Sequence, residues 1–158
     1  METSHPKVPE LIYGTLLVMA LVGAMAELHA GTSEAFAALL GSGVALWFAH
    51  SYSTTVGIQL QRGRYLNRRE IWSVLRDELF VVAILPLPLT LLVLAEVGLF
   101  STTTALRLSA WGGVAILFIA GVTVARQTAA SSTWTIVAGL GHAALGGVII
   151  LLEYIFAH

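Results

Sequence analysis

The chain has 158 residues, of which 57% are hydrophobic and only 11% are charged, and its mean hydropathy is +0.85. Soluble domains carry about 25% charged residues, so this composition excludes an ordinary soluble protein and indicates a membrane protein. The net charge is −1, and the absence of cysteine excludes disulfides, thiolate metal sites and a cysteine nucleophile. At this length we expect a single domain over residues 1–158 and no nucleic-acid partner.

Five apolar stretches of the sequence are long enough to cross a bilayer, whose core takes about 20 helical residues. Short polar turns separate them. Pro86 and Pro88 interrupt the third stretch, where we expect a kink near mid-membrane because proline removes helical hydrogen bonds. The sequence therefore predicts an all-α, polytopic bundle of five transmembrane helices. The expected spans are residues 11–28, 36–60, 79–100, 105–125 and 134–157.

Basic residues fall on one side of the predicted bundle. That side holds Lys7, Arg126 and an arginine-rich loop, residues 62–76, which contains five arginines. Arg107 lies within the fourth span. Because Lys and Arg favour cytoplasmic loops, the amino terminus is predicted inside and the carboxy terminus outside. An odd number of spans agrees with this orientation. The expected location is a bacterial inner membrane.

The arginine-rich loop is predicted to hold a short helix at the membrane surface, before the third span. Asn67 and Glu70 have the spacing of a capping box, in which two side chains satisfy free amides at a helix start. The loop arginines are candidates for contacts with anionic lipid headgroups, or they serve as topology signals alone. The headgroup candidates are Arg62, Arg64, Arg68 and Arg69.

The second span carries an ionisable side chain, His50, below its middle. On a helix, His50 shares one face with Trp47 and Thr54, and glycines at 43 and 57 extend that face. Polar groups at membrane depth are costly unless they face protein or water, which makes them candidates for a functional site. The alternative is that His50 makes only an interhelical hydrogen bond.

Further ionisable residues are predicted at inner, middle and outer depths of the membrane, at about 1.5 Å per helical residue. We interpret them as a polar path that begins at the inner side, continues through the fifth span and ends near the outer side. Histidine changes protonation near neutral pH, which suits such a path. The predicted members are Glu10, Tyr13, His50, Tyr52, Glu78, His142 and Glu153.

Small residues recur at every fourth position of the fifth span. Gly139, Ala143 and Gly147 form the small-xxx-small pattern that lets helix backbones approach closely, within the chain or between protomers. A simpler interpretation of His142 is therefore that it bonds a neighbouring carbonyl in a packing helix.

The outer side of the predicted bundle holds a cation within a span. Arg107 lies in the outer part of the fourth span, and an intramembrane cation needs a carboxylate partner. Glu27 and Glu96 are predicted to lie toward the same side. We therefore predict an outer ion pair between Arg107 and one of these two carboxylates.

Three short segments carry a resemblance to known proteins. They are Glu10-Leu11-Ile12-Tyr13-Gly14-Thr15, Trp47-Phe48-Ala49-His50-Ser51-Tyr52 and Leu151-Leu152-Glu153. Together they resemble a family of small, uncharacterised bacterial integral membrane proteins that is common in actinobacteria. The resemblance implies membrane location and a helical bundle, and it carries over no catalytic residue.

Three classes of function are open. An embedded enzyme would need a nucleophile with its base, or metal ligands such as His-Glu-x-x-His; neither pattern is present, and no metal site or particular cofactor is indicated. The Glu and His residues favour an oligomeric channel or transporter for protons or small cations. The alternative is a structural or accessory protein that binds lipid or a larger membrane complex.

Overall fold

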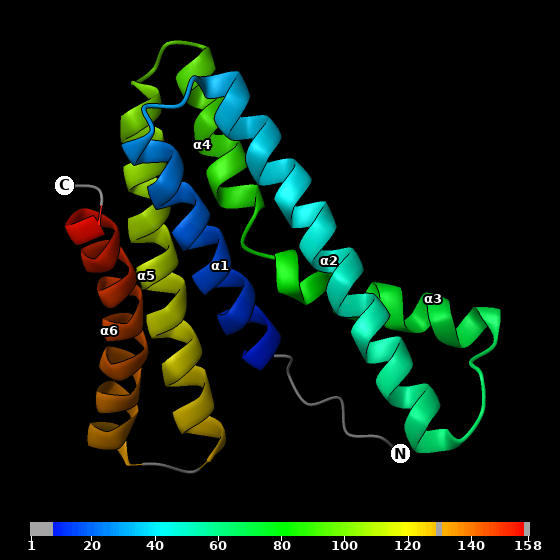
Figure 1. The fold of residues 1–158 in the computed structure, drawn as a ribbon. Helices are drawn as coiled ribbons and strands as arrows, with labels where there is room; N and C mark the ends of the chain where they lie inside the picture. The colour runs from blue at the N-terminus through cyan, green and yellow to red at the C-terminus, as the bar shows by residue number, and fades with distance from the viewer. Residues whose placement is uncertain (1–7, 129–130, 157–158) are drawn as a thin grey trace.

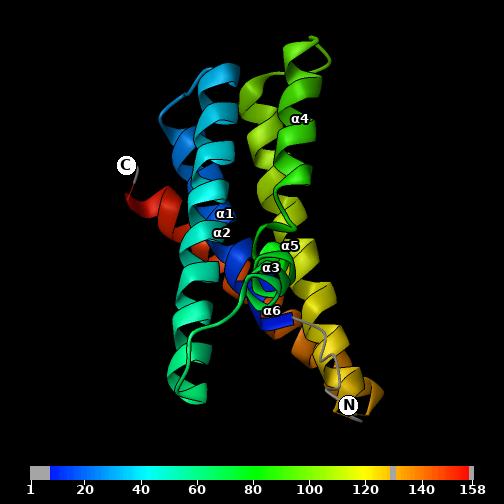
Figure 2. The same ribbon diagram turned by 90° about the vertical axis from the view of Figure 1, so that its right-hand side faces the viewer.

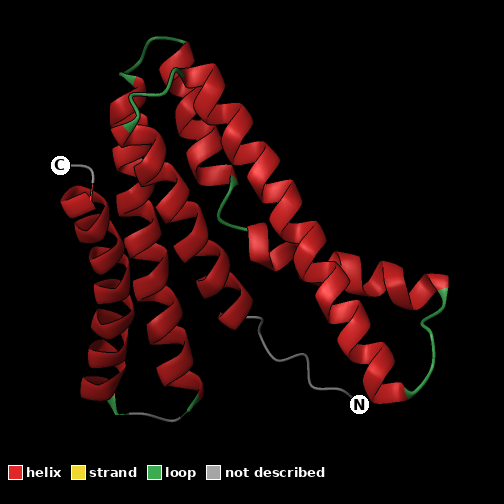
Figure 3. Cartoon of the chain, viewed as in Figure 1, coloured by secondary structure: helices red, strands yellow, loops and turns green. Residues whose placement is uncertain are grey.

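The computed structural model describes residues 8–128 and 131–156, and these ranges are helical apart from short turns. No strand occurs in them, so the predicted all-α class is confirmed. Figure 3 shows the helices joined end to end by short loops. The elements are α1 (Val8–Glu27), α2 (Thr32–Arg62), α3 (Arg68–Asp77), the 3-10 helix η1 (Glu78–Val82), α4 (Pro86–Glu96), α5 (Thr102–Gln127) and α6 (Ser132–Phe156).

The described residues contain up to five candidate membrane spans. By length and composition α1, α2, α5 and α6 can each cross a membrane, and α3–η1 together with α4 forms a fifth candidate that bends by 57°. Helices α1, α2, α4, α5 and α6 alternate in direction along the chain (Figure 1). A hydrogen bond of 2.6 Å between the hydroxyls of Thr32 and Thr102 ties the start of α2 to the start of α5. The α1–α2 and α4–α5 turns therefore share one end of the bundle.

Helix α2 is longer than the predicted apolar stretch. Its 31 residues correspond to about 46 Å, against about 30 Å for the hydrocarbon core of a bilayer. The helix ends at Gly63, whose φ of 62° lies in the left-handed region that favours glycine. Because of this length, α2 carries the arginine-rich loop well away from the end where it begins.

The predicted break in the third span is present at the prolines, and its depth in a membrane stays a prediction. η1 ends at Val82, and α4 begins at Pro86. Pro86 and Pro88 sit in the first turn of α4, where backbone amides have no partner within the helix, so the missing N–H groups cost little there. The prolines start a new helix instead of kinking an existing one.

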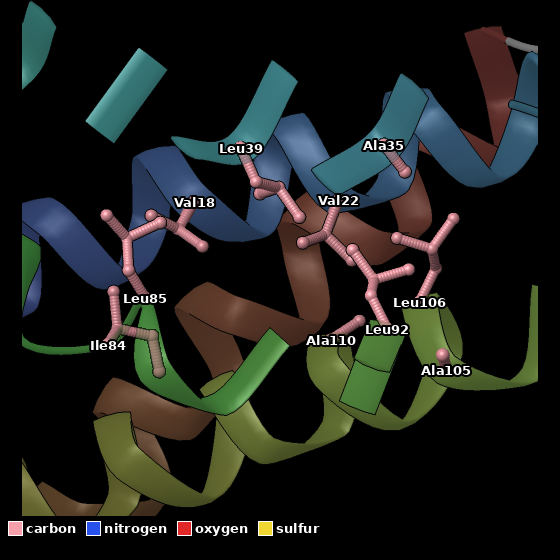
Figure 4. Close-up of a cluster of buried hydrophobic side chains, with 10 residues drawn as sticks. All are labelled: Val18, Val22, Ala35, Leu39, Ile84, Leu85, Leu92, Ala105, Leu106 and Ala110. Carbon is pink, nitrogen blue, oxygen red and sulfur yellow. The ribbon is translucent and has the colours of Figure 1, made fainter. Parts of the chain in front are cut away.

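The hydrophobic core lies where α1, α2, α4 and α5 meet. Figure 4 shows side chains from these helices, and from the break between η1 and α4, pointing into one cluster. Leu39 of α2 and Leu92 of α4 are completely buried there. In a bilayer such contacts hold helices together by close packing, because lipid tails are as apolar as leucine. The members are Val18, Val22, Ala35, Leu39, Ile84, Leu85, Leu92, Ala105, Leu106 and Ala110.

Helix α6 packs along α5 (Figure 1), and glycines lie at this contact. A Cβ at Gly121 would lie 2.6 Å from the Ala138 carbonyl oxygen, and a Cβ at Gly139 would lie 2.8 Å from the Phe118 ring. A Cβ at Gly147, by contrast, would meet nothing within 4 Å. Of the predicted small-residue seam, Gly139 thus lies at a close helix contact and Ala143 is half-buried. Contact of Gly147 with another protomer stays a prediction.

Helix α1 also approaches η1 closely, at Gly14. A Cβ at Gly14 would overlap the carbonyl group of Val81. Since that neighbour is backbone rather than the end of a flexible side chain, it cannot move aside without shifting η1. Gly14 therefore sets the distance between α1 and the broken third span.

This close approach predicts opposite effects for two Gly→Ala changes. Gly14→Ala should destabilise the protein by about 1–3 kcal/mol, because the added methyl group overpacks the contact with Val81. Gly41→Ala in α2, where a Cβ would meet nothing within 4 Å, should leave the Tm unchanged or raise it because alanine favours helix. Thermal unfolding in detergent measures both variants. Equal Tm values would show that α1 and η1 are not this close.

Candidate functional site

The ionisable side chains of His50 in α2 and Glu78 in η1 lie in contact. Nε2 of His50 lies 3.2 Å from Oε2 of Glu78. The Glu78 side chain is 5% exposed and the His50 side chain 31%, so a buried carboxylate faces a partly accessible imidazole. The contact is an ion pair when the imidazole is protonated. The structure thus brings together two members of the predicted polar path.

The position of Glu78 depends on how α3 and η1 lie against α2. Figure 2 looks down α3, which runs across the direction of α2. Trp47, about one turn before His50, donates its indole N–H to the carbonyl oxygen of Leu75 at 2.9 Å. A Cβ at Gly43 would collide with the side chain of Leu85, so α2 also approaches the break closely. These two contacts fix the register of η1 along α2.

Helix α1 places Tyr13 beside this contact, and Glu10 lies one turn earlier on the same face of α1. The Tyr13 ring lies beside His50, with 6.1 Å between the ring centroids. Oε2 of Glu10 is buried and has no hydrogen-bond partner among the described residues. Glu10, Tyr13 and Gly14 share one face of α1 by helical spacing, and Gly14 packs against η1. We call Glu10, Tyr13, His50 and Glu78 the inner cluster.

The inner cluster has the chemistry of a proton or small-cation site. A carboxylate and an imidazole in contact can exchange a proton, and ionisable residues inside helical bundles mark such relays. Carboxylate oxygens are also ligands for hard cations. In the part of the chain that the structure describes, no group of three His, Cys, Asp or Glu side chains is placed to hold a metal ion.

Tyr52 lies outside the inner cluster, and its part in the predicted path stays a prediction. It is 68% exposed and lines a groove between α2 and α3 with Phe48 and Ile71. Successive helical residues are rotated by about 100°, so a residue two positions after His50 points to the opposite side of α2. Depth alone had placed Tyr52 with His50, and the helical face separates them.

His142 makes a local contact within α6. Its Nδ1 lies 2.9 Å from the carbonyl oxygen of Ala138, one turn earlier. The ring packs on α5 at Gly121, where a Cβ would lie 2.7 Å from Nδ1. This is the contact expected of a packing helix. The side chain of Glu153 lies outside the described residues, so the continuation of the path from His142 to Glu153 stays a prediction.

Arg107 and Glu27 lie at the opposite end of the bundle from the arginine-rich loop. Both line one groove between α1, α5 and α6, together with Trp111 and Tyr154. Among the described residues, no ion pair of 4.0 Å or less joins Arg107 to a carboxylate. Glu96 is exposed at the end of α4 and does not line the groove. The predicted outer ion pair is therefore not formed among the described residues, although Glu27 and Arg107 line the same groove.

Glu70 organises the arginine-rich loop. It accepts hydrogen bonds from Arg62 at 2.8 Å and Arg64 at 2.6 Å, and its side chain completes the capping box with Asn67 at the start of α3. These hydrogen bonds, that from Arg64 foremost, lower the pKa of Glu70 from 4.5 to about 2. Two of the four headgroup candidates are thus engaged by a carboxylate. Arg68 and Arg69 are exposed, and in the described ranges neither has an ion pair.

The contacts that position the inner cluster were not predicted. Trp47 shares the predicted face of His50, which is the available signal, but its partner is a backbone carbonyl that no sequence pattern marks. Gly14 follows Glu10 by one turn, which hints at a close approach on that face. Nothing in the sequence pairs it with Val81.

Comparisons with family models, curated proteins and solved structures found no match for the chain. The resemblance to small bacterial integral membrane proteins therefore stays a prediction. A function has to follow from the side chains of this chain and from their contacts.

The ion pairs of Glu70 predict a low titration midpoint. A carboxyl whose pKa is lowered on folding stabilises the fold fully above its unfolded value of 4.5, and the contribution is lost as the pH falls through about 2. The carboxyl 13C shift of Glu70, followed by NMR in detergent, should have its midpoint near 2. Arg64→Gln should raise the midpoint toward 4.5, whereas Arg69→Gln, at an exposed neighbouring arginine, should not. A wild-type midpoint near 4.5 would contradict these ion pairs.

Proposed function

We propose that this chain is a multi-pass protein of a bacterial inner membrane that transports protons or small cations, with the inner cluster as its ion-binding site. The observation that carries the proposal is the contact of 3.2 Å between His50 and the buried Glu78 at a break in a candidate span. Backbone that is not helical is tolerated at membrane depth where it is covered by protein or lines a cavity. Transporters use such broken helices to build ion sites.

The proposed orientation places the inner cluster on the cytoplasmic side. The arginine-rich loop and Arg126 lie at one end of the alternating helices, and Arg107 lies toward the other end, where Thr32 bonds Thr102 (Figure 1). Since basic residues favour cytoplasmic loops, the amino terminus would be inside and the carboxy terminus outside. His50 and Glu78 then lie between the arginine-rich loop and the middle of the bundle.

Helix α3 would lie at the cytoplasmic membrane surface. Val74 is buried against the bundle, whereas Trp72 is 67% exposed and Arg68 and Arg69 are free of ion pairs within the described ranges. Aromatic and basic side chains favour the headgroup region of anionic lipids. This placement would hold η1, and with it Glu78, at a fixed depth.

Transport would begin with binding at the inner cluster. His50 is the more accessible partner and would exchange a proton with the cytoplasm, while the buried Glu78 would receive it or bind a small cation. A single bundle of this size is narrow, so we propose an oligomer. The onward route through His142 toward Glu153 is the predicted continuation.

The second candidate is a non-transporting accessory protein that binds lipid or a larger membrane complex. The contact of His142 with the Ala138 carbonyl favours it, because that histidine then serves packing of α6 on α5. In this case the inner cluster would fix the third span against α2 and carry no ion. Flux measurements separate the two candidates.

The proposal predicts pH-dependent flux in liposomes that contain the purified protein, driven by a potassium gradient and read by an internal pH dye. His50→Ala and Glu78→Gln should each suppress flux by roughly tenfold or more, because each removes one of the two ionisable groups that would exchange the proton or bind the cation. Replacing sodium by a large organic cation tests whether a cation moves instead of a proton. His142→Ala should suppress flux if the route continues through α6.

His29 supplies the matched control. It is exposed in the α1–α2 turn and has a φ of 51°, a conformation that asparagine tolerates, so His29→Asn removes an imidazole without straining the backbone. This variant should conduct like the wild type. No flux in the wild type, or equal flux in the His50→Ala and His29→Asn variants, would favour the accessory protein.

A further inference from the structure

The groove lined by Glu27 and Arg107 has no role in the proposed transport. It has a volume of about 230 Å³ and lies between the carboxy-terminal part of α1, the amino-terminal part of α5 and the carboxy-terminal part of α6. These three segments lie side by side in Figure 1. The groove is at the end of the bundle opposite the arginine-rich loop.

Two opposite charges face this groove without meeting each other. Glu27 ends α1, and Arg107 lies in the second turn of α5. Both side chains are exposed, and within the described residues no ion pair joins them. A ligand that carries one negative and one positive group would therefore match the groove better than an ion of either sign alone.

The rest of the lining is apolar and aromatic. Val22, Leu106 and Ile150 form its deeper wall, and Trp111 and Tyr154 lie at its rim. Tryptophan and tyrosine favour the boundary between acyl chains and headgroups. An ammonium group is attracted to the faces of such rings. The groove thus combines an acyl-chain wall with a polar rim.

We propose that this groove binds one zwitterionic phospholipid of the phosphatidylethanolamine type. Arg107 binds the phosphate through its two-pronged guanidinium, Glu27 binds the ammonium group, and an acyl chain lies on the apolar wall. An anionic lipid without an ammonium group offers Glu27 only repulsion. The site is independent of the inner cluster, and its test does not depend on transport.

Native mass spectrometry of the full chain tests the site. The protein is mixed in detergent with equal amounts of phosphatidylethanolamine and phosphatidylglycerol, and the lipids that stay bound after release from detergent are compared. The wild type should retain phosphatidylethanolamine in preference by roughly tenfold, the ratio expected for one charge-assisted hydrogen bond. Glu27→Gln should remove the preference while both lipids still bind. Arg107→Gln should reduce retention of both lipids. Retention by Arg107→Lys should lie between that of Arg107→Gln and that of the wild type, because lysine keeps the positive charge but cannot bind the phosphate through two N–H groups at once.

Arg126→Gln is the matched control, since Arg126 is an exposed arginine at the other end of α5. It should retain both lipids like the wild type. Equal retention of the two lipids by the wild type would overturn the proposal. So would a Glu27→Gln variant that keeps the preference, or equal losses in Arg107→Gln and Arg126→Gln. Thermal unfolding of each variant confirms that it is folded.

Discussion

The structure depends on the contact between the buried carboxylate of Glu78 and the imidazole of His50. Glu78 is the first residue of η1, so its side chain reaches α2 only because the third candidate span breaks before Pro86 and α3 turns across the bundle. Changing either side chain of a contact that includes a buried carboxylate should cost stability. The break before Pro86, the position of η1 along α2 and the contact between His50 and Glu78 therefore depend on one another.

Two contacts on either side of η1 maintain this arrangement. On the α2 side, Trp47 bonds the Leu75 carbonyl and holds the end of α3. On the α1 side, Gly14 lets the helix approach Val81, which also brings Tyr13 to His50. A short helix with little intrinsic stability is thus held by neighbours on both sides. We infer that the break is maintained to position Glu78, and that this gives the inner cluster its proposed function.

The helices could be predicted from the sequence because long apolar stretches and the capping box at Asn67 are local signals. Depth placed His50 and Glu78 among the members of one predicted path, but their direct contact was not predicted. Depth alone grouped Tyr52 with His50, whereas Tyr52 is exposed on another side of α2. The prolines predicted the break, but not that they would begin a new helix in its first turn. Contacts such as Trp47 with Leu75 involve backbone atoms and depend on tertiary register, which no local pattern encodes.

The most direct test is a double-mutant cycle of His50→Ala and Glu78→Gln, measured by unfolding in detergent near pH 6. If the two side chains are in contact, the free energies of the single variants should fail to add in the double variant by about 0.5 kcal/mol or more. The same cycle with His29→Asn in place of His50→Ala should be additive. Additivity in both cycles would contradict a contact between His50 and Glu78, and with it the proposed ion-binding site.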